Sequence, residues 1–182
     1  MPEILQWLRM RYKMAIAILV FVVLAFLAVR NLSAQAHVDK KAYDVMLSSL
    51  LSHSVPEMEV EKLEVDGNYV LLDAREQAEF TVSHVPGAVW VGYDDFDMSR
   101  LEGIDKEQPI VVYCSVGYRS EKIAERLKDA GYPHVSNLYG GIFEWVNHGN
   151  EVVDMDNQPT ENVHAYSPSW GVWLKKGRKV YE

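Results

Sequence analysis

Residues 110–120 read IVVYCSVGYRS, and this stretch decides the fold class and the candidate chemistry. Its first four residues are apolar with no polar alternation, which is typical of a strand buried on both faces of a parallel sheet. Cys114 opens a short loop, and the spacing of apolar residues predicts a helix over 120–130, closed by Gly131. Ligands of open α/β sheets bind beyond the carboxyl ends of the strands, so we expect Cys114 at a binding edge.

The flanking sequence continues this alternation of strands and helices. Strands are predicted over 69–72, 89–91 and 135–138, and helical segments over 76–80 and 140–145. Short connections between them predict an α/β fold with a doubly wound, mostly parallel sheet of about five strands.

An amphipathic helix is expected ahead of the sheet, in residues 37–54. Its inward face is predicted to carry Ala42, Val45, Met46, Leu50 and Leu51, with Asp39 as N-cap.

The cysteine itself has two interpretations. Cys114 is the only cysteine, which excludes a disulfide framework, a multi-cysteine metal site and an internal resolving thiol. An inert core thiol is the common fate of a buried cysteine. We favour a reactive thiolate, because loop amides and the first turn of the next helix converge on this position, and Gly117 allows the tight curl.

Four blocks together resemble the rhodanese-like sulfurtransferase family: LLDAREQAEF (71–80), SHVPGAVWV (83–91), PIVVYCSVGYRSEKIAERLKDAGY (109–132) and VSNLYGGIFEWVNHG (135–149). The resemblance covers about 55–153 and implies a rhodanese-like domain over those residues. It places Cys114 at the position that carries the persulfide, as the catalytic residue.

The same resemblance implies the rest of the site. The substrate-binding loop would comprise Ser115, Val116, Gly117, Tyr118, Arg119 and Ser120. Asp73 and Arg75 would support that loop, and Arg119 would either attract an anionic donor or lock the loop to an acid. Phosphatases and arsenate reductases of related fold resemble each other in a longer loop, whose arginine would fall at Ser120 here.

The expected activity is therefore that of a rhodanese-type sulfurtransferase, of the thiosulfate sulfurtransferase class. Sulfane sulfur would pass from a thiosulfate-like or persulfide donor to Cys114, and then to an external thiol, another nucleophile or a protein acceptor. This chemistry requires no cofactor and no metal. The alternative is a rhodanese-fold binding or sulfur-carrier module with little turnover, which recruits a partner through its C-terminal tail.

The N-terminal sequence predicts that the protein is located outside the cytoplasm. Residues 14–29 form an apolar run behind Arg9, Arg11 and Lys13, and Ala34-Gln35-Ala36 fits a cleavage site. Residues 1–36 are thus either a signal peptide or a transmembrane signal anchor. The charge bias orients the N-terminus inward, so the protein is expected to be periplasmic, or bound to the membrane through 14–29 and facing outward.

Charge and the C-terminus complete the sequence. The net charge is −8, and removal of 1–36 leaves 14 basic and 25 acidic residues, net −11. This sign argues against a nucleic-acid partner. Residues 154–182, hereafter the C-terminal extension, are aromatic and basic. We expect this extension to pack back on the domain, with a partner or membrane surface as the alternative.

Overall fold

The computed structural model describes residues 14, 16, 18, 20, 41–66 and 68–182. The chain divides into two units, residues 1–35 and 36–182. In the first unit, the described Met14, Ile16, Ile18 and Val20 are helical and exposed. The remainder of the apolar run at 14–29 and the cleavage-site pattern at 34–36 lie outside the described residues. Among the residues that are described, no helix has the length and apolarity needed to span a bilayer. Export and anchoring therefore stay predictions from the sequence.

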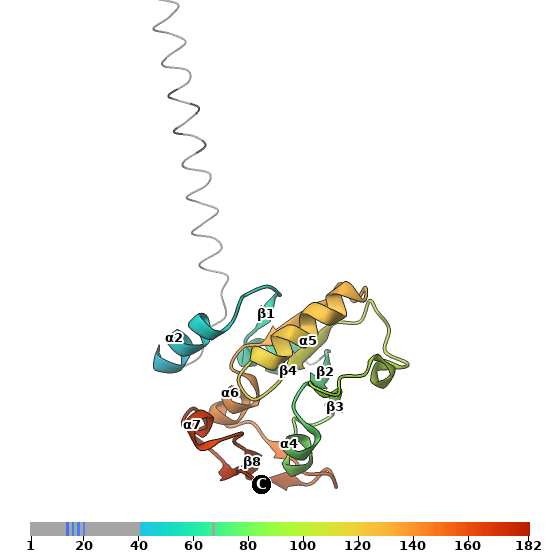
Figure 1. The fold of residues 1–182 in the computed structure, drawn as a ribbon, viewed down its shortest axis with the longest axis vertical. Coiled ribbons are helices and arrows are strands. Elements are labelled where there is room, and N and C mark those ends of the chain that lie inside the picture. The colour runs from blue at the N-terminus through green and yellow to red at the C-terminus, as the bar shows by residue number, and fades with distance from the viewer. Residues whose placement is uncertain (1–13, 15, 17, 19, 21–40, 67) are drawn as a thin grey trace, which may run out of the picture. The chain divides into compact units, whose positions relative to one another are not determined.

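The second unit is built on a five-stranded sheet (Figure 1). All neighbouring strands are parallel, in the order β1-β5-β4-β2-β3. The strands are β1 (Glu57–Met58), β2 (Val70–Asp73), β3 (Val89–Trp90), β4 (Ile110–Tyr113) and β5 (Val135–Leu138). The predicted parallel sheet is confirmed. The edge strand β1 was not predicted, because Glu57–Met58 lacks the apolar run that marked residues 89–91 as a strand.

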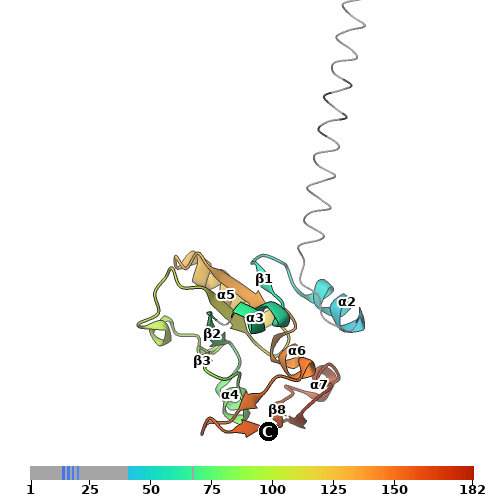
Figure 2. The same ribbon diagram turned by 180° about the vertical axis from the view of Figure 1, so that it is seen from behind.

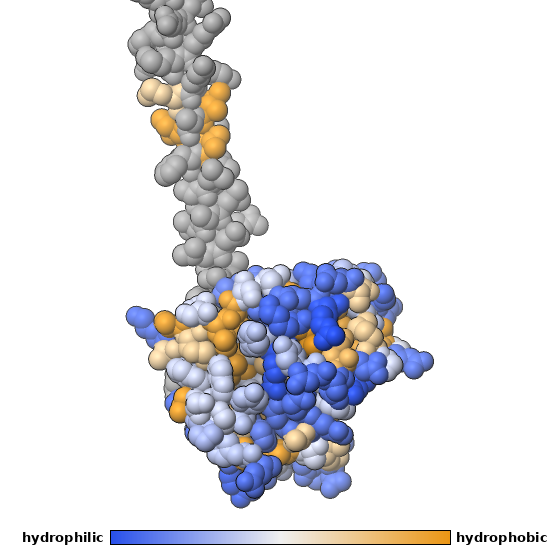
Figure 3. Space-filling model, in the orientation of Figure 1, coloured by the Kyte–Doolittle hydropathy of each residue, from blue (hydrophilic) through white to orange (hydrophobic). Residues whose placement is uncertain are grey.

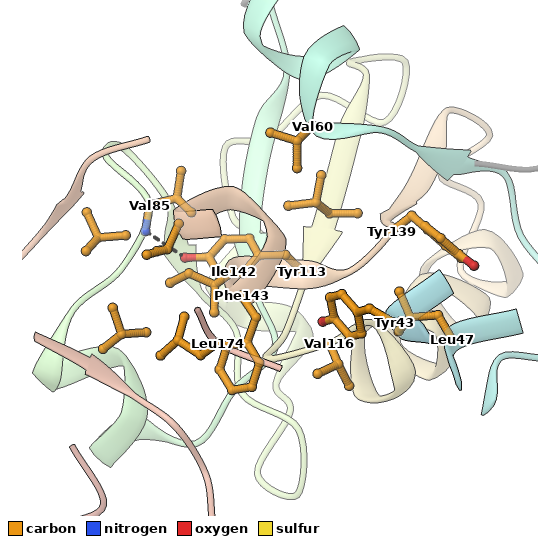
Figure 4. Close-up of a cluster of buried hydrophobic side chains, with 14 of the residues drawn as sticks. Tyr43, Leu47, Val60, Val85, Tyr113, Val116, Tyr139, Ile142, Phe143 and Leu174 are labelled. Carbon is orange, nitrogen blue, oxygen red and sulfur yellow. Dashed lines mark hydrogen bonds between the residues drawn. The ribbon is translucent and has the colours of Figure 1, made fainter. Parts of the chain in front are cut away.

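Helices cover both faces of this sheet (Figures 1 and 2). They are α2 (Lys41–Leu50), α3 (Val60–Asp66), α4 (Gln77–Val82), the 3-10 helix η1 (Met98–Leu101), α5 (Tyr118–Asp129), α6 (Gly141–His148) and α7 (Pro168–Gly171). Strand β4 separates two apolar clusters, because successive side chains of a strand point to opposite faces. Ile110 and Val112 pack with α5 on one face, whereas Val111 and Tyr113 pack with α2, α3 and α6 on the other (Figure 4).

The structure corrects the inward face predicted for the first helix. Tyr43 and Leu47, four residues apart, are the buried residues of α2. Ala42 and Val45 are exposed, so their prediction as inward residues was wrong. The hydroxyl of Tyr43 donates to the carbonyl of Gly140 at 2.8 Å, which lets this polar side chain lie in the core. The proposed cap Asp39 lies outside the described residues.

Two helices begin at residues other than those predicted. Helix α5 begins at Tyr118, two residues before the predicted start, because Gly117 at φ +125° makes the turn from the loop. Helix α4 spans Gln77–Val82, with Glu76 at its N-cap.

The C-terminal extension packs on the domain. Within it, Pro159–Thr160 forms β7 and pairs antiparallel with β6 (Val152–Val153). Strands β8 (Asn162–His164) and β9 (Arg178–Val180) form a second small sheet. Val163 and Leu174 are fully buried, and the ring of Trp173 stacks on Tyr43 with centroids 5.2 Å apart. The expectation that the extension folds back is confirmed.

The face of the second unit seen in Figure 3 is mainly hydrophilic, with apolar side chains in small groups among polar ones.

Candidate active site

Cys114 lies immediately beyond the end of β4, where the sequence placed it. The strand is central, with β2 on one side and β5 on the other, so the carboxyl ends of three parallel strands meet at this edge. The hydroxyl of Tyr113, at the last position of β4, accepts a hydrogen bond from the Val85 amide at 3.1 Å (Figure 4). Cys114 is 1% exposed. It is thus a buried thiol on a strongly constrained backbone.

The loop directs a backbone donor at the sulfur. The amide of Gly117 lies 3.1 Å from Cys114 Sγ and donates to it. Gly117 has φ +125°, a conformation that side-chain-bearing residues rarely adopt, and it forms the N-cap of α5. A sulfur at this position therefore accepts a hydrogen bond from an amide at the N-terminus of a helix.

The N-terminus of helix α6 forms two backbone hydrogen bonds with the loop. The amides of Ile142 and Phe143 donate to the carbonyls of Cys114 and Ser115, at 2.9 and 3.2 Å. Gly141 makes this close approach feasible, since a Cβ there would lie 2.4 Å from the Cys114 carbonyl oxygen. The first turn of α6 thus holds both carbonyls at the start of the loop.

Arg119 pairs with an acid, the contact that one of the two roles expected for it requires. Its guanidinium donates to both carboxylate oxygens of Glu79, at 2.6 and 2.8 Å. The Ser115 hydroxyl also donates to Glu79, at 3.0 Å. Burial raises the pKa of Glu79, but the hydrogen bonds and charge of Arg119 outweigh it, so that this pKa falls below its usual value. Glu79 was missed by sequence reasoning, although it lies within the block at 71–80.

Asp73 and Arg75 form a completely buried ion pair, with Nη2 and Oδ2 2.6 Å apart. The same Nη2 donates to the Ser83 carbonyl at 2.6 Å. The pair therefore fixes the two ends of the segment that carries α4 and Glu79. Its support of the Cys114 loop runs through that segment.

A cavity of about 370 Å³ adjoins the sulfur. Five of the predicted site residues line it: Cys114, Ser115, Val116, Tyr118 and Arg119. Six lining residues were not predicted: Leu50, Glu76, Tyr93, Asp94, Tyr166 and Trp170. They come from α2, from the β2–α4 and β3–η1 connections and from the C-terminal extension, so no local sequence signal groups them.

Gly117 and Ser120 are absent from this lining. The buried hydroxyl of Ser120 donates to Asn137 Oδ1 at 2.7 Å, and the Asn137 amide donates to the Gly117 carbonyl at 3.0 Å. These bonds hold the Gly117 carbonyl, in the peptide unit that leads into α5. Ser120 thus positions the loop instead of facing the cavity.

Residues 58–148 match the family model of the rhodanese-like domain. A thiosulfate:glutathione sulfurtransferase of Saccharomyces cerevisiae is 30% identical over 121 residues, covering 60% of this chain and 87% of the yeast protein. A tRNA uridine(34) hydroxylase of Listeria monocytogenes is 36% identical over 132 residues. The match covers 60% of this chain but only 40% of the hydroxylase.

The fold is also similar to that of solved rhodanese-like domains. The solution structure of a rhodanese-like domain from the Anabaena sp. Alr3790 protein superposes with a TM-score of 0.51 at 23% identity. The superposition covers 55% of this chain and 80% of that domain.

Proposed function

Because the chain belongs to the rhodanese-like domain family, we propose that it is a sulfurtransferase that carries sulfane sulfur as a persulfide on Cys114. One observation carries this proposal: the Cys114 sulfur accepts a 3.1 Å hydrogen bond from the Gly117 amide and borders the cavity of about 370 Å³. A donor that enters the cavity meets a sulfur whose negative charge the loop is built to stabilise.

The proposed reaction has two displacements. The Cys114 thiolate attacks the outer sulfur of a donor, forms a new S–S bond and expels the rest of the donor as an anion. An external thiolate then attacks the terminal sulfur of the Cys114 persulfide and carries it away, which regenerates the Cys114 thiolate. Since the chain has no second cysteine, the acceptor comes from another molecule.

The loop length supports sulfur transfer over hydrolysis of phosphate esters. Arg119 lies five residues after Cys114, and Glu79 occupies its guanidinium. A tetrahedral oxyanion would require that guanidinium, or further donors, to turn to the centre of the loop.

The names of the relatives suggest different substrates. The yeast relative is named for thiosulfate and glutathione, which makes a small thiol a reasonable acceptor to propose here. A tRNA substrate has less support. The chain spans 40% of the hydroxylase, and its net charge of −8 has the same sign as a phosphate backbone.

The test is formation of a persulfide on the full chain. We expect incubation with thiosulfate or a persulfide donor to add the mass of one sulfur atom, which a thiol or cyanide then removes. The substitution Cys114→Ser should abolish the gain and leave the fold intact by circular dichroism. Sulfur transfer that survives in Cys114→Ser would overturn the proposal.

The alternative of a sulfur-carrier or binding module makes a different prediction. A carrier would gain the sulfur but pass it to small thiols slowly, whereas an enzyme would turn over many times. The C-terminal extension lines the cavity with Tyr166 and Trp170 and leaves the space beside Cys114 unfilled, which favours turnover.

A further inference from the structure

The cavity beside Cys114 has an acidic lining. Glu76 and Asp94 border it, and among its lining residues in the described part of the chain Arg119 is the one cation. Glu79 binds that guanidinium through two hydrogen bonds, and Glu76 lies 3.8 Å from it. These three acids outnumber the arginine, so a ligand in the cavity is exposed to a negative field.

Two further cations near the mouth are already engaged. Lys122 and Arg126 border a neighbouring depression that shares Tyr93 and Asp94 with the cavity. The Lys122 ammonium lies 2.8 Å from the Glu125 carboxylate, and the Arg126 guanidinium lies 4.7 Å from the centre of the Phe96 ring. The Lys122 charge is therefore balanced by a carboxylate, whereas Arg126 keeps its charge and packs on a neutral ring in the neighbouring depression.

Four aromatic residues also line the cavity. Tyr93, Tyr118, Tyr166 and Trp170 contribute rings, and the last two come from the C-terminal extension. Tyr166 holds a left-handed backbone at φ +62°, and its ring lies 5.1 Å from the Arg119 guanidinium carbon. Aromatic faces attract cations through the ring quadrupole, and such rings combined with carboxylates form recognition sites for organic ammonium groups.

We infer that this site selects small persulfide donors that carry a protonated amine and discriminates against anionic donors such as thiosulfate. The inference rests on the proposed function, because it names the donor class for the Cys114 reaction. The donor's ammonium would lie against Glu76, Asp94 and the aromatic rings while its outer sulfur meets Cys114.

The transfer step balances without any other reactant. A donor R–S–SH gives up its S–S bond as the Cys114 thiolate attacks the outer sulfur, yielding Cys114–S–SH and the thiolate R–S⁻. The proton stays on the transferred sulfur or moves to the leaving thiolate. No electrons are gained or lost overall.

Three donors of one size test this inference with the full chain: the persulfides of cysteamine, 2-mercaptoethanol and 3-mercaptopropionate. They share a spacer of two methylene groups between the sulfur and a terminal group that is positive, neutral or negative. The measurement is the rate at which Cys114 gains one sulfur, followed by intact mass. The ratio of the cysteamine rate to the mercaptopropionate rate is then compared between variants, so that intrinsic donor reactivity cancels.

Removal of one lining charge should change that ratio. We expect Glu76→Gln to lower the ratio about tenfold, since it weakens attraction of the cation and repulsion of the anion together. Asp94→Asn is a second variant with the same expectation, in case Glu76→Gln disturbs the start of α4. The matched control is Glu102→Gln, an exposed acid outside the lining, which should leave the ratio unchanged.

Two substitutions of Trp170 test the contribution of the aromatic lining residues. Trp170→Leu should lower the cysteamine rate severalfold with little effect on the neutral donor, and Trp170→Phe should retain most of it because a ring remains. The inference is overturned if all three donors load Cys114 but Glu76→Gln and Asp94→Asn give the same ratio as Glu102→Gln. If none of the donors loads Cys114, and thiosulfate does not either, the proposed function falls as well.

Discussion

Glu79 connects the Cys114 loop to the segment that α4 occupies. Its carboxylate accepts hydrogen bonds from Arg119 and from the Ser115 hydroxyl, and its side chain is 3% exposed. A buried carboxylate with a single guanidinium partner is costly to leave half paired. We therefore regard Glu79 as a positioning residue, which acts on the sulfur through Arg119 and Ser115.

Glu79→Gln should lower the free energy of unfolding by about 3 kcal/mol at neutral pH, because it leaves the Arg119 charge with a neutral partner. The pKa of Glu79 is below its usual 4.5, so the ion pair stabilises the folded state above about pH 4.5. That stability is lost as the pH falls through the lower folded-state value. The difference between wild type and Glu79→Gln in urea unfolding should therefore be constant from pH 7 to 6 and shrink below pH 4.5.

The matched control for that experiment is Glu102→Gln, whose carboxylate is exposed and should cost less than about 0.5 kcal/mol. A Glu79→Gln difference that stays the same down to pH 3 would show that the carboxylate charge does not stabilise the fold.

At the level of elements, the site depends on where two helices begin. Gly117 ends the loop and starts α5, and Gly141 starts α6 beneath the Cys114 carbonyl. Both have positive φ, but their surroundings differ. A Cβ at Gly117 would find its nearest atoms at 3.5 Å, whereas a Cβ at Gly141 would lie 2.4 Å from backbone.

This difference gives a graded prediction for three alanine substitutions. Gly103→Ala has no atom within 4 Å of its new Cβ and reports the cost of φ +87° alone, about 1 kcal/mol. Gly141→Ala should cost at least about 2 kcal/mol more, because α6 must move away from the loop. Urea unfolding measures the loss of stability in each variant. An equal loss in Gly103→Ala and Gly141→Ala would contradict the close approach of α6 to the loop.

Gly117→Ala should separate stability from activity. Its cost in unfolding free energy should be near that of Gly103→Ala, while the rate of Cys114 persulfide formation should fall at least about tenfold. The reason is that a relaxed φ turns the Gly117 amide away from the sulfur. An unchanged rate in a folded Gly117→Ala protein would remove this amide from the mechanism.

For the whole molecule, the C-terminal extension is part of the core that supports the site. Val163, Ala165 and Leu174 are fully buried in the cluster that also holds residues of α2 and α6. The same extension supplies two aromatic residues to the cavity. Folding of the extension and formation of the cavity wall are thus one event.

A pair of neighbouring substitutions tests this coupling. Leu174→Ala should lower the free energy of unfolding by about 2–5 kcal/mol, as loss of a fully buried leucine does, and should slow persulfide formation. Val172→Ala, at a side chain that is 48% exposed, should change stability by less than about 0.5 kcal/mol. Equal effects of the two substitutions would mean that the extension contributes little to the core.

The parallel sheet, the position of Cys114 and the residues of its loop could be predicted from the sequence. These features are local: a run of four buried apolar residues, a cysteine at the strand end and a glycine before a helix lie within 11 residues. The family blocks added that Asp73 and Arg75 lie near the site, and the structure shows them as a buried pair at the end of β2.

The surroundings of the sulfur could not be predicted from the sequence, because they depend on how distant segments pack. The partner of Arg119 is Glu79, 40 residues earlier, and the cavity wall includes Leu50, Tyr93 and Trp170 from three separate parts of the chain. The inward face of α2 was mispredicted for the same reason, because which stripe of a weakly amphipathic helix is buried depends on the surface it meets. Local patterns record how a segment folds, whereas contacts between distant segments follow from packing the whole chain, and the donor preference of this site resides in those contacts.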